Sequence, residues 1–221
     1  MWAEAAPLVR AGGATLDPWL GRQADDARRG VTLLARPAPV VAAALDAFLG
    51  ELRALEPAQY YQPLADLHHT VLSLFTATAD HAPHLEHLPA YRAAVDEAIA
   101  GVPPFTIEIR GVTLAAGAVL AQGFPHDDTL ASVRDRLRAA LAARGLGGAL
   151  DRRYRLETAH MTLVRFAAPL RDPARFVDAL AAARTTEFGA SAVESLDLVL
   201  GDWYNTAAHQ RVLARYQLRT R

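Results

Sequence analysis

Two stretches of the chain share one pattern, LHHTVLSL at residues 67–74 and AHMTLVRF at residues 159–166. In each, a histidine and a threonine stand two positions apart and are followed by mostly apolar residues. The pairs are His68 with Thr70 and His160 with Thr162. The apolar, partly β-branched runs favour strands. Because side chains at positions i and i+2 of a strand lie on the same face, the two members of each pair are expected to point the same way.

The same order of elements surrounds both stretches. Each half of the chain is patterned as strand, helix, strand, helix and strand, over about residues 30–112 and 118–218. A duplication of this kind produces two similar lobes that face each other across a cleft. We therefore predict one α+β domain over residues 30–218, with two mostly antiparallel sheets flanking a central cleft and helices outside. Residues 1–29 are irregular and predict an N-terminal surface arm or a short helix.

The hydrophobic pattern assigns each element of the domain to a stretch. Helices are expected at residues 40–55, 89–100, 128–144 and 172–183. Strands are expected at residues 31–35, 67–75, 105–109, 118–124, 156–166, 192–200 and 211–218. Both histidine-threonine pairs therefore fall in the second strand of their half.

The composition excludes several mechanisms. The 221 residues include no cysteine, and all 23 basic residues are arginine. Without cysteine there is no disulfide, no thiolate zinc or iron–sulfur site and no thiol nucleophile. Without lysine there is no P-loop, no Schiff-base chemistry and no lysyl-adenylate of the kind used by ATP-driven ligases. The side chains left for catalysis are His, Asp, Glu, Ser, Thr, Tyr and Arg.

Charge and hydropathy limit the partners. The formal net charge is −1, and the sequence pI is about 6.7, so a basic face that holds long duplex nucleic acid is not expected. No uncharged apolar run reaches the length that spans a membrane, and the N-terminus lacks the basic and apolar regions of a signal peptide. We expect a cytoplasmic monomer with no membrane partner.

The two pairs together have a chemical meaning. Pseudo-symmetry of the lobes would bring two imidazoles and two hydroxyls to a space one phosphate wide. Imidazole titrates near neutrality, so one histidine can take a proton while the other gives one. Threonine hydroxyls can donate hydrogen bonds to non-bridging phosphate oxygens as charge develops there. His68, Thr70, His160 and Thr162 are therefore predicted to be catalytic.

Paired His-x-Thr motifs in the two halves of a duplicated chain resemble those of the 2H phosphoesterase superfamily, which includes 2′-5′ RNA ligase-like proteins and 2′,3′-cyclic nucleotide phosphodiesterases. The resemblance covers about residues 30–218. It implies a bilobal α+β fold and metal-independent, cofactor-free hydrolysis of a 2′,3′-cyclic phosphate on a nucleotide or RNA end, commonly to a 2′-phosphate. It also implies that one histidine activates water while the other protonates the leaving 3′-oxygen. We assign His160 as the base and His68 as the acid.

Aromatic residues near the motifs are candidates for substrate binding, because an aromatic ring at a cleft rim can stack on a nucleobase. Tyr61 precedes the first motif, and Trp203 follows the predicted strand at 192–200. We predict both as substrate-binding residues, with packing at the rim of the core as the alternative. The run Arg152-Arg153-Tyr154-Arg155 forms either a solvated basic turn or a patch that draws an anionic ligand toward the cleft.

Two polar residues inside the motif strands are expected to be structural. His69 lies on the opposite strand face from His68. Strand alternation likewise places Arg165 opposite His160 unless a β-bulge intervenes, and we expect Arg165 to pair with an acid elsewhere.

Three further functions remain open. The same chemistry could act on a 2′-5′ linkage or a cyclic oligonucleotide, or run in reverse as ATP-independent RNA 2′-5′ ligation. The chain could also be a non-catalytic module that binds a nucleotide or RNA end. A metal hydrolase could use His81, His84 and His87. Because Pro83 breaks the helical spacing of these three, we expect them to be solvated loop histidines instead.

Overall fold

The computed structural model describes residues 1–150 and 158–219. Its helices are α1 (Trp2–Arg10), α2 (Pro39–Leu55), α3 (Ala82–Leu85), α4 (Leu88–Ile99), α5 (Thr129–Ala143) and α6 (Pro173–Ala182). Its strands are β1 (Arg29–Ala35), β2 (Tyr60–Tyr61), β3 (His69–Thr78), β4 (Phe105–Ala115), β5 (Ala118–Pro125), β6 (Ala159–Arg165), β7 (Glu187–Val193), β8 (Ser195–Gly201) and β9 (Arg211–Gln217).

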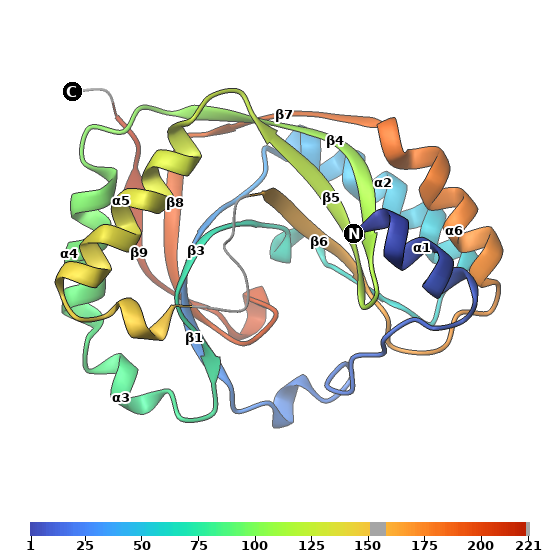
Figure 1. Ribbon diagram of the computed structural model, residues 1–221, viewed down its shortest axis with the longest axis horizontal. Helices are drawn as coiled ribbons and strands as arrows, with labels where there is room; N and C mark the ends of the chain where they lie inside the picture. Colours follow the sequence, from blue (N-terminus) through green and yellow to red (C-terminus); the bar gives the residue numbers. More distant parts are fainter. Residues whose placement is uncertain (151–157, 220–221) are drawn as a thin grey trace.

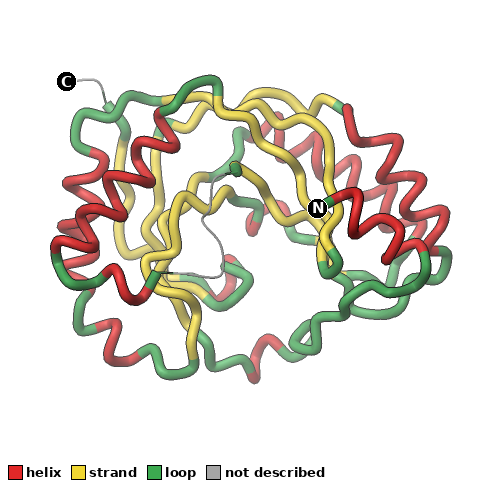
Figure 2. The backbone as a smooth tube through the Cα atoms, in the orientation of Figure 1, coloured by secondary structure: helices red, strands yellow, loops and turns green. Residues whose placement is uncertain are grey.

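The strands of this described part form two antiparallel sheets, with the orders β3-β1-β8-β9 and β2-β6-β5-β4-β7. Helices lie on the outer side of each sheet (Figures 1 and 2). α4 and α5 pack together beside the first sheet, whereas α1, α2 and α6 pack beside the second. The predicted α+β class, with two antiparallel sheets and helices outside, is confirmed.

The two sequence halves each contribute strands to both sheets. β1 of the first half pairs with β3 on one side and with β8 of the second half on the other, and β9 follows β8, while β2 and β4 of the first half join β5, β6 and β7. The cause is the short connection between β4 and β5, where Ala115 pairs with Ala118. A two-residue connection makes the flanking strands antiparallel neighbours. The boundary drawn between residues 112 and 118 therefore lies at a hairpin, and β4 of the first half is exchanged for β8 and β9 of the second.

Several elements differ from the sequence-based expectation. The strand expected at 192–200 is two strands, β7 and β8, which are interrupted at Glu194. β4 continues past residue 109 through Gly111, where the backbone has φ +70° and a Cβ would lie 2.1 Å from the carbonyl oxygen of Arg184. Only glycine fits this bend, which lets β4 pair with both β5 and β7. Residues 156 and 157 of the expected strand 156–166 lie outside the described residues.

The predicted N-terminal arm begins with a packed helix. α1 buries Ala5, Ala6 and Val9 and lies against α6 and β4. Residues 11–28 then cross from α1, beside the second sheet, to β1 of the first sheet (Figure 1). Within the described residues, no helix combines the length and apolar character that a membrane crossing requires.

A contiguous hydrophobic core fills the space between the sheets and their helices. The faces of the sheets that point away from this core differ from it in exposure and polarity. On β3 and β6, the residues that alternate with the buried ones are half-exposed and polar. These faces position the candidate site.

Candidate active site

A cavity of about 600 Å³ lies where β1 and β3 of one sheet approach β6 of the other, and the loop after β8 contributes residues 202–205 to it. The four residues predicted to be catalytic, His68, Thr70, His160 and Thr162, all line this cavity. The fold therefore brings both motifs to one space, as the duplication led us to expect.

A β-bulge adjusts the cavity-facing row of β3. The pairing with β1 passes from Leu72 to Thr70 and skips Val71. An extra residue in one strand reverses the alternation beyond it. Ser73, three positions after Thr70, is consequently half-exposed and lines the cavity. A second shift along the same pairing places Thr76 on the cavity side as well.

A matching bulge occurs in β6 and changes the position of Arg165. The pairing with β5 skips Leu163, so Arg165, three positions after Thr162, lies on the same face as Thr162 and lines the cavity. The expectation that Arg165 points away from the cavity is therefore wrong, and the bulge is the reason. The expected pairing with an acid does occur, because Nη1 of Arg165 is 3.9 Å from Oδ2 of Asp17.

His68 is held by its backbone surroundings. Its Nδ1 lies 2.7 Å from the carbonyl oxygen of Asp66, which ends a short 3₁₀ helix just before β3. A carbonyl only accepts, so Nδ1 carries a hydrogen and donates it. In the neutral ring, Nε2 is then the acceptor. The side-chain Nδ2 of Asn205 lies 3.5 Å from this Nε2.

His160 has a different partner. Its Nδ1 lies 3.0 Å from the hydroxyl oxygen of Thr158, the residue before β6. A hydroxyl can either donate or accept. His160 can therefore gain or lose a proton without losing this hydrogen bond.

The cavity favours the neutral forms of both histidines. Burial lowers the pKa of His68 to about 4, and the positive charges of Arg36, His160 and Arg165 act in the same direction. Burial also lowers the pKa of His160, with Arg134 adding to the effect. An anion bound among these groups would reverse part of the shift, because an opposite charge favours the protonated imidazole.

Arg134 of α5 fastens the two motif strands together. It is 2% exposed and donates from Nε to the carbonyl of Val71 at 2.9 Å. Its Nη2 donates to the carbonyls of Thr70 at 2.9 Å and Thr158 at 3.0 Å. One guanidinium thus bridges the backbone beside both His-x-Thr pairs.

Arg134 was not identified from the sequence, although a signal exists. It lies on the apolar stripe of α5, among buried residues at helical spacing. The stripe is Leu130, Val133, Leu137 and Leu141. A charged residue on such a stripe is buried and needs partners.

His69 lies on the other face of β3 from Thr70, as expected. It is 1% exposed, and burial lowers its pKa to about 3. This histidine is a neutral part of the packed interior and does not line the cavity.

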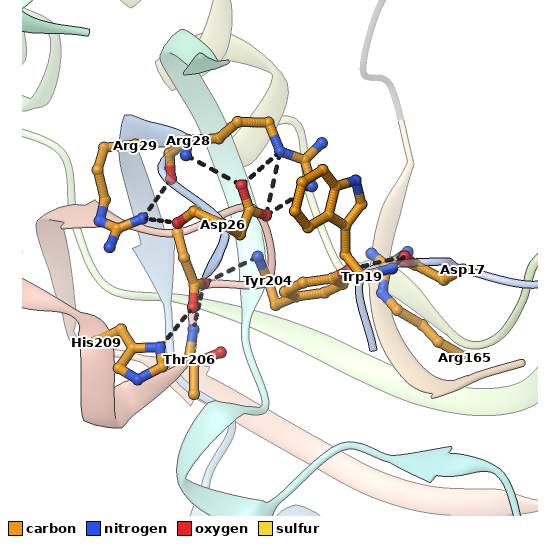
Figure 3. A network of polar contacts seen from close by, with 10 residues as sticks. Asp17, Trp19, Asp26, Arg28, Arg29, Arg165, Tyr204, Thr206 and His209 are labelled. Atoms are coloured by element: carbon orange, nitrogen blue, oxygen red, sulfur yellow. Dashed lines mark hydrogen bonds and ion pairs between the residues drawn. The ribbon is translucent and has the colours of Figure 1, made fainter. Parts of the chain in front are cut away.

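The N-terminal arm reaches the cavity residues through a polar network (Figure 3). The hydroxyl of Tyr204 donates to Oδ1 of Asp17 at 2.8 Å, the same carboxylate that faces Arg165. The guanidinium of Arg165 also lies 5.2 Å from the centre of the Tyr204 ring. The arm therefore supplies a negative charge beside a cationic residue of the cavity wall.

Of the two predicted substrate-binding aromatics, Trp203 lines the cavity. The guanidinium of Arg28 lies 4.7 Å from its ring centre and 5.4 Å from that of Trp19. A bidentate ion pair with the buried Asp26 fixes Arg28 in this position. The Trp203 ring at the cavity wall therefore lies against a cation that Asp26 holds in place.

Tyr61, the other predicted substrate-binding residue, does not line the cavity. Its side chain is buried, and its hydroxyl shares its one hydrogen between the carbonyls of Leu52 at 2.8 Å and Glu56 at 2.9 Å. These contacts tie the end of α2 to β2. Tyr61 packs in the core, which corrects the expectation that it stacks on a base. The Arg152–Arg155 run lies outside the described residues.

The three closely spaced histidines do not meet at one point. His81 precedes α3, and the ring of His84 stacks on Phe75 with centroids 4.6 Å apart. Among residues 1–150 and 158–219, no group of three or more His, Asp or Glu side chains is arranged to hold a metal ion.

Comparison with known proteins gives a likeness at the level of structure. No protein-family model matches the sequence. No curated protein matches it either. Among solved structures, TT0787 of Thermus thermophilus is 19% identical, with a TM-score of 0.65 over 86% of this chain and 98% of that one. A protein described only as a phosphoesterase is 17% identical, with a TM-score of 0.55 over 88% and 99%.

A third similar structure is Escherichia coli LigT complexed with 3′-AMP. It is 16% identical, with a TM-score of 0.56 over 87% of this chain and 99% of LigT. The likeness covers nearly the whole length of each of these proteins. This chain therefore has the fold of LigT, of TT0787 and of the solved phosphoesterase.

Proposed function

We propose that this chain is a 2H phosphoesterase that hydrolyses a 2′,3′-cyclic phosphate on a nucleotide or RNA end without a metal ion. The observation that carries the proposal is that both His-x-Thr pairs line one cavity. The fold shared with a phosphoesterase, and with LigT bound to 3′-AMP, supports it. Arg165 on the same wall adds a cation where an anionic phosphate would need one.

The proposed reaction needs one proton acceptor and one proton donor. One neutral imidazole takes a proton from water as the water oxygen attacks phosphorus. The bond between phosphorus and the 3′-oxygen breaks, and the other, charged imidazole gives its proton to that oxygen. The product has a 2′-phosphate and a 3′-hydroxyl. The hydroxyls of Thr70 and Thr162 donate to the non-bridging oxygens as their charge grows.

The surroundings of the two imidazoles favour roles opposite to those first assigned with the family resemblance. Burial lowers the pKa of both histidines, that of His68 to about 4. The carbonyl of Asp66 keeps the hydrogen of the neutral His68 ring on Nδ1, so Nε2 is its proton acceptor. The hydroxyl beside Nδ1 of His160 can instead accept from a charged ring. In addition, Nε2 of His68 has an N–H donor beside it and is set up as an acceptor. We accordingly propose His68 as the base and His160 as the acid.

A substrate with a better leaving group shows which histidine is the base and which is the acid. In a cyclic phosphate whose bridging 3′-oxygen is replaced by sulfur, the leaving thiolate needs no proton. His160→Ala is expected to recover most of the activity that it loses on the oxygen substrate, whereas His68→Ala stays impaired on both. Initial rates of the two variants on the matched pair of substrates measure this. Recovery in His68→Ala instead would restore the first assignment, with His160 as the base.

The lowered pKa values predict an acidic optimum for kcat/KM. The reactive form has His68 neutral and His160 charged, so it is lost as pH falls through about 4 and as pH rises through the pKa of His160, which lies below the ordinary 6.5. Because kcat/KM follows the free enzyme, we expect a bell-shaped profile with its maximum between these limits. The kcat profile should lie at higher pH, since bound phosphate favours imidazolium. A kcat/KM maximum above pH 7 would contradict this proposal.

A panel of nucleotide substrates distinguishes the proposed activity from its alternatives. We expect kcat/KM for 2′,3′-cyclic nucleotides to exceed that for 3′,5′-cyclic nucleotides and for 2′-5′-linked dinucleotides, with the 2′-phosphate as product. A preference for the 2′-5′ linkage, or net ligation of RNA ends, would instead support the related activities. Tight nucleotide binding without any product over long incubation would indicate a non-catalytic module.

A further inference from the structure

The loop between β8 and β9 carries an unusual backbone conformation at the cavity. Asn205 has φ +54° and is the only non-glycine residue of the described chain with positive φ. This conformation is uncommon outside glycine, and asparagine is among the residues that tolerate it best. Because Asn205 also lines the cavity, its conformation calls for a functional explanation.

Two aspartates hold this loop in place. The buried Asp202 accepts from the backbone N–H groups of Tyr204 at 2.9 Å and Thr206 at 3.0 Å. The carboxylate of Asp66 accepts from the N–H of Ala207 at 2.7 Å. The backbone carbonyl of Asp66 also accepts a hydrogen bond from Nδ1 of His68. One residue thus fixes both the imidazole and the loop that faces it.

Arg36 adds a second link between the same two segments. Its Nη1 donates to the carbonyl of Ala65 at 2.8 Å, just ahead of His68. Its Nη2 donates to the side-chain oxygen of Gln210 at 2.7 Å, at the far end of the loop. The position of Asn205 relative to His68 is therefore determined from both sides.

The carboxamide of Asn205 fits a space left by a glycine. A Cβ on Gly201 would lie 2.6 Å from Oδ1 of Asn205. With Oδ1 seated there, Nδ2 lies 3.5 Å from Nε2 of His68. Since Nε2 is the lone-pair nitrogen of the neutral ring, the group facing it must be a donor, which agrees with an N–H at this position.

We propose that Asn205 is a further catalytic residue: its side-chain N–H donates to a non-bridging oxygen of the phosphate that reacts beside His68. The contact to His68 is long for a hydrogen bond, so exchanging it for a phosphate oxygen costs little free energy. It forms no covalent bond. It contributes a neutral donor fixed in advance where negative charge grows, together with Thr70 and Thr162. This proposal rests on the proposed function, whose chemistry supplies the phosphate.

Three variants test the role of the carboxamide. Asn205→Gly keeps the positive φ and removes the amide, whereas Asn205→Asp keeps its size and replaces the donor by an acceptor. Gly201→Ala keeps Asn205 but displaces its carboxamide from the space it occupies. We expect each to lower kcat on a 2′,3′-cyclic nucleotide by about 10²–10³-fold, with circular dichroism spectra like that of the wild type. A kcat for Asn205→Gly within about threefold of the wild-type value would overturn the proposal.

A measurement on His68 tests whether the side chain at position 205 lies beside its ring. Imidazole NMR titration should show a higher pKa for His68 in Asn205→Asp than in the wild type, because a carboxylate favours the charged ring. The other charged groups facing His68, Arg36, His160 and Arg165, are unchanged in this variant. An unchanged pKa of His68 in Asn205→Asp would overturn the proposed placement.

A binding experiment keeps this test separate from the proposed function. Inorganic phosphate is titrated into the wild type and into Asn205→Gly while the His68 and His160 signals are followed. We expect about 3–10-fold weaker binding in the variant, the effect of one lost hydrogen bond. Equal affinity, or no phosphate binding by the wild type, would overturn the role of Asn205. If the wild type binds phosphate through Asn205 but hydrolyses no cyclic phosphate, only the proposed function fails.

Discussion

His68→Ala and His160→Ala are each expected to lower kcat/KM for a 2′,3′-cyclic nucleotide by about 10²–10⁴-fold. Each variant loses one of the two proton transfers, and no other imidazole lines the cavity within the described residues. Because both side chains are only half-buried, the melting temperature should change by no more than about 4 °C. Steady-state kinetics and thermal denaturation of the same preparations provide the two measurements.

His126→Ala is the matched control for these variants. His126 is exposed and does not line the cavity, so this variant should match the wild type in rate and in melting temperature. If His68→Ala or His160→Ala kept more than about a tenth of the wild-type kcat/KM, a mechanism with two imidazoles would be contradicted.

Arg134→Met should cause the largest loss of stability among single substitutions at the site. Methionine fills a similar length but offers no N–H, so the buried carbonyl of Val71 and the part-buried carbonyls of Thr70 and Thr158 lose their guanidinium donors. Leaving such groups unsatisfied costs about 1–3 kcal/mol each, and we expect a loss of about 3–5 kcal/mol in the free energy of unfolding. For a chain of this size, that lowers the melting temperature by roughly 10 °C.

Arg136→Met is the matched control on the same helix. Arg136 also donates to two backbone carbonyls, of Glu97 and Ala100, but it is exposed. Water can replace its hydrogen bonds, so we expect a loss of under about 1 kcal/mol. Denaturant unfolding of the two variants compares them directly. Equal destabilisation would mean that Arg134 has no special part in joining the two motif strands.

Arg134→Met should also shift the pH dependence of the reaction. Arg134 contributes to the lowered pKa of His160, so removing its charge raises that pKa. The basic limb of the kcat/KM profile should then move to higher pH. This readout separates the electrostatic effect of Arg134 from its effect on folding.

The fold and the centre of the site could be predicted from the sequence because both depend on local periodicity. Alternation within the strands and the repeated order of elements indicated two antiparallel layers, and the i, i+2 spacing placed His68 with Thr70 and His160 with Thr162. These features need no knowledge of distant contacts. They also survive the exchange of β4 for β8 and β9, since that exchange leaves β3 and β6 on opposite walls of the cavity.

The remaining features depend on contacts that local patterns do not encode. The bulge that turns Arg165 toward the cavity arises from pairing with β5. The placement of Asn205 depends on Asp66, which is far away in the sequence, and on the absence of a side chain at Gly201. The sequence position of Tyr61 predicted an aromatic ring at the cleft rim. Its hydroxyl is instead hydrogen-bonded to carbonyl groups at the end of α2, and the side chain is buried in the core. In each case, a tertiary contact overrides the local expectation.

The most direct test of the central claim is ³¹P NMR of a 2′,3′-cyclic nucleotide incubated with the chelator-treated wild-type protein. We predict that the cyclic phosphate signal is replaced by that of a 2′-phosphomonoester at a rate unaffected by chelation, and that the His68→Ala, His160→Ala double variant produces no such signal. A cyclic signal that persists with the wild type, or conversion that returns only after a metal ion is added, would contradict metal-free catalysis by the two histidines.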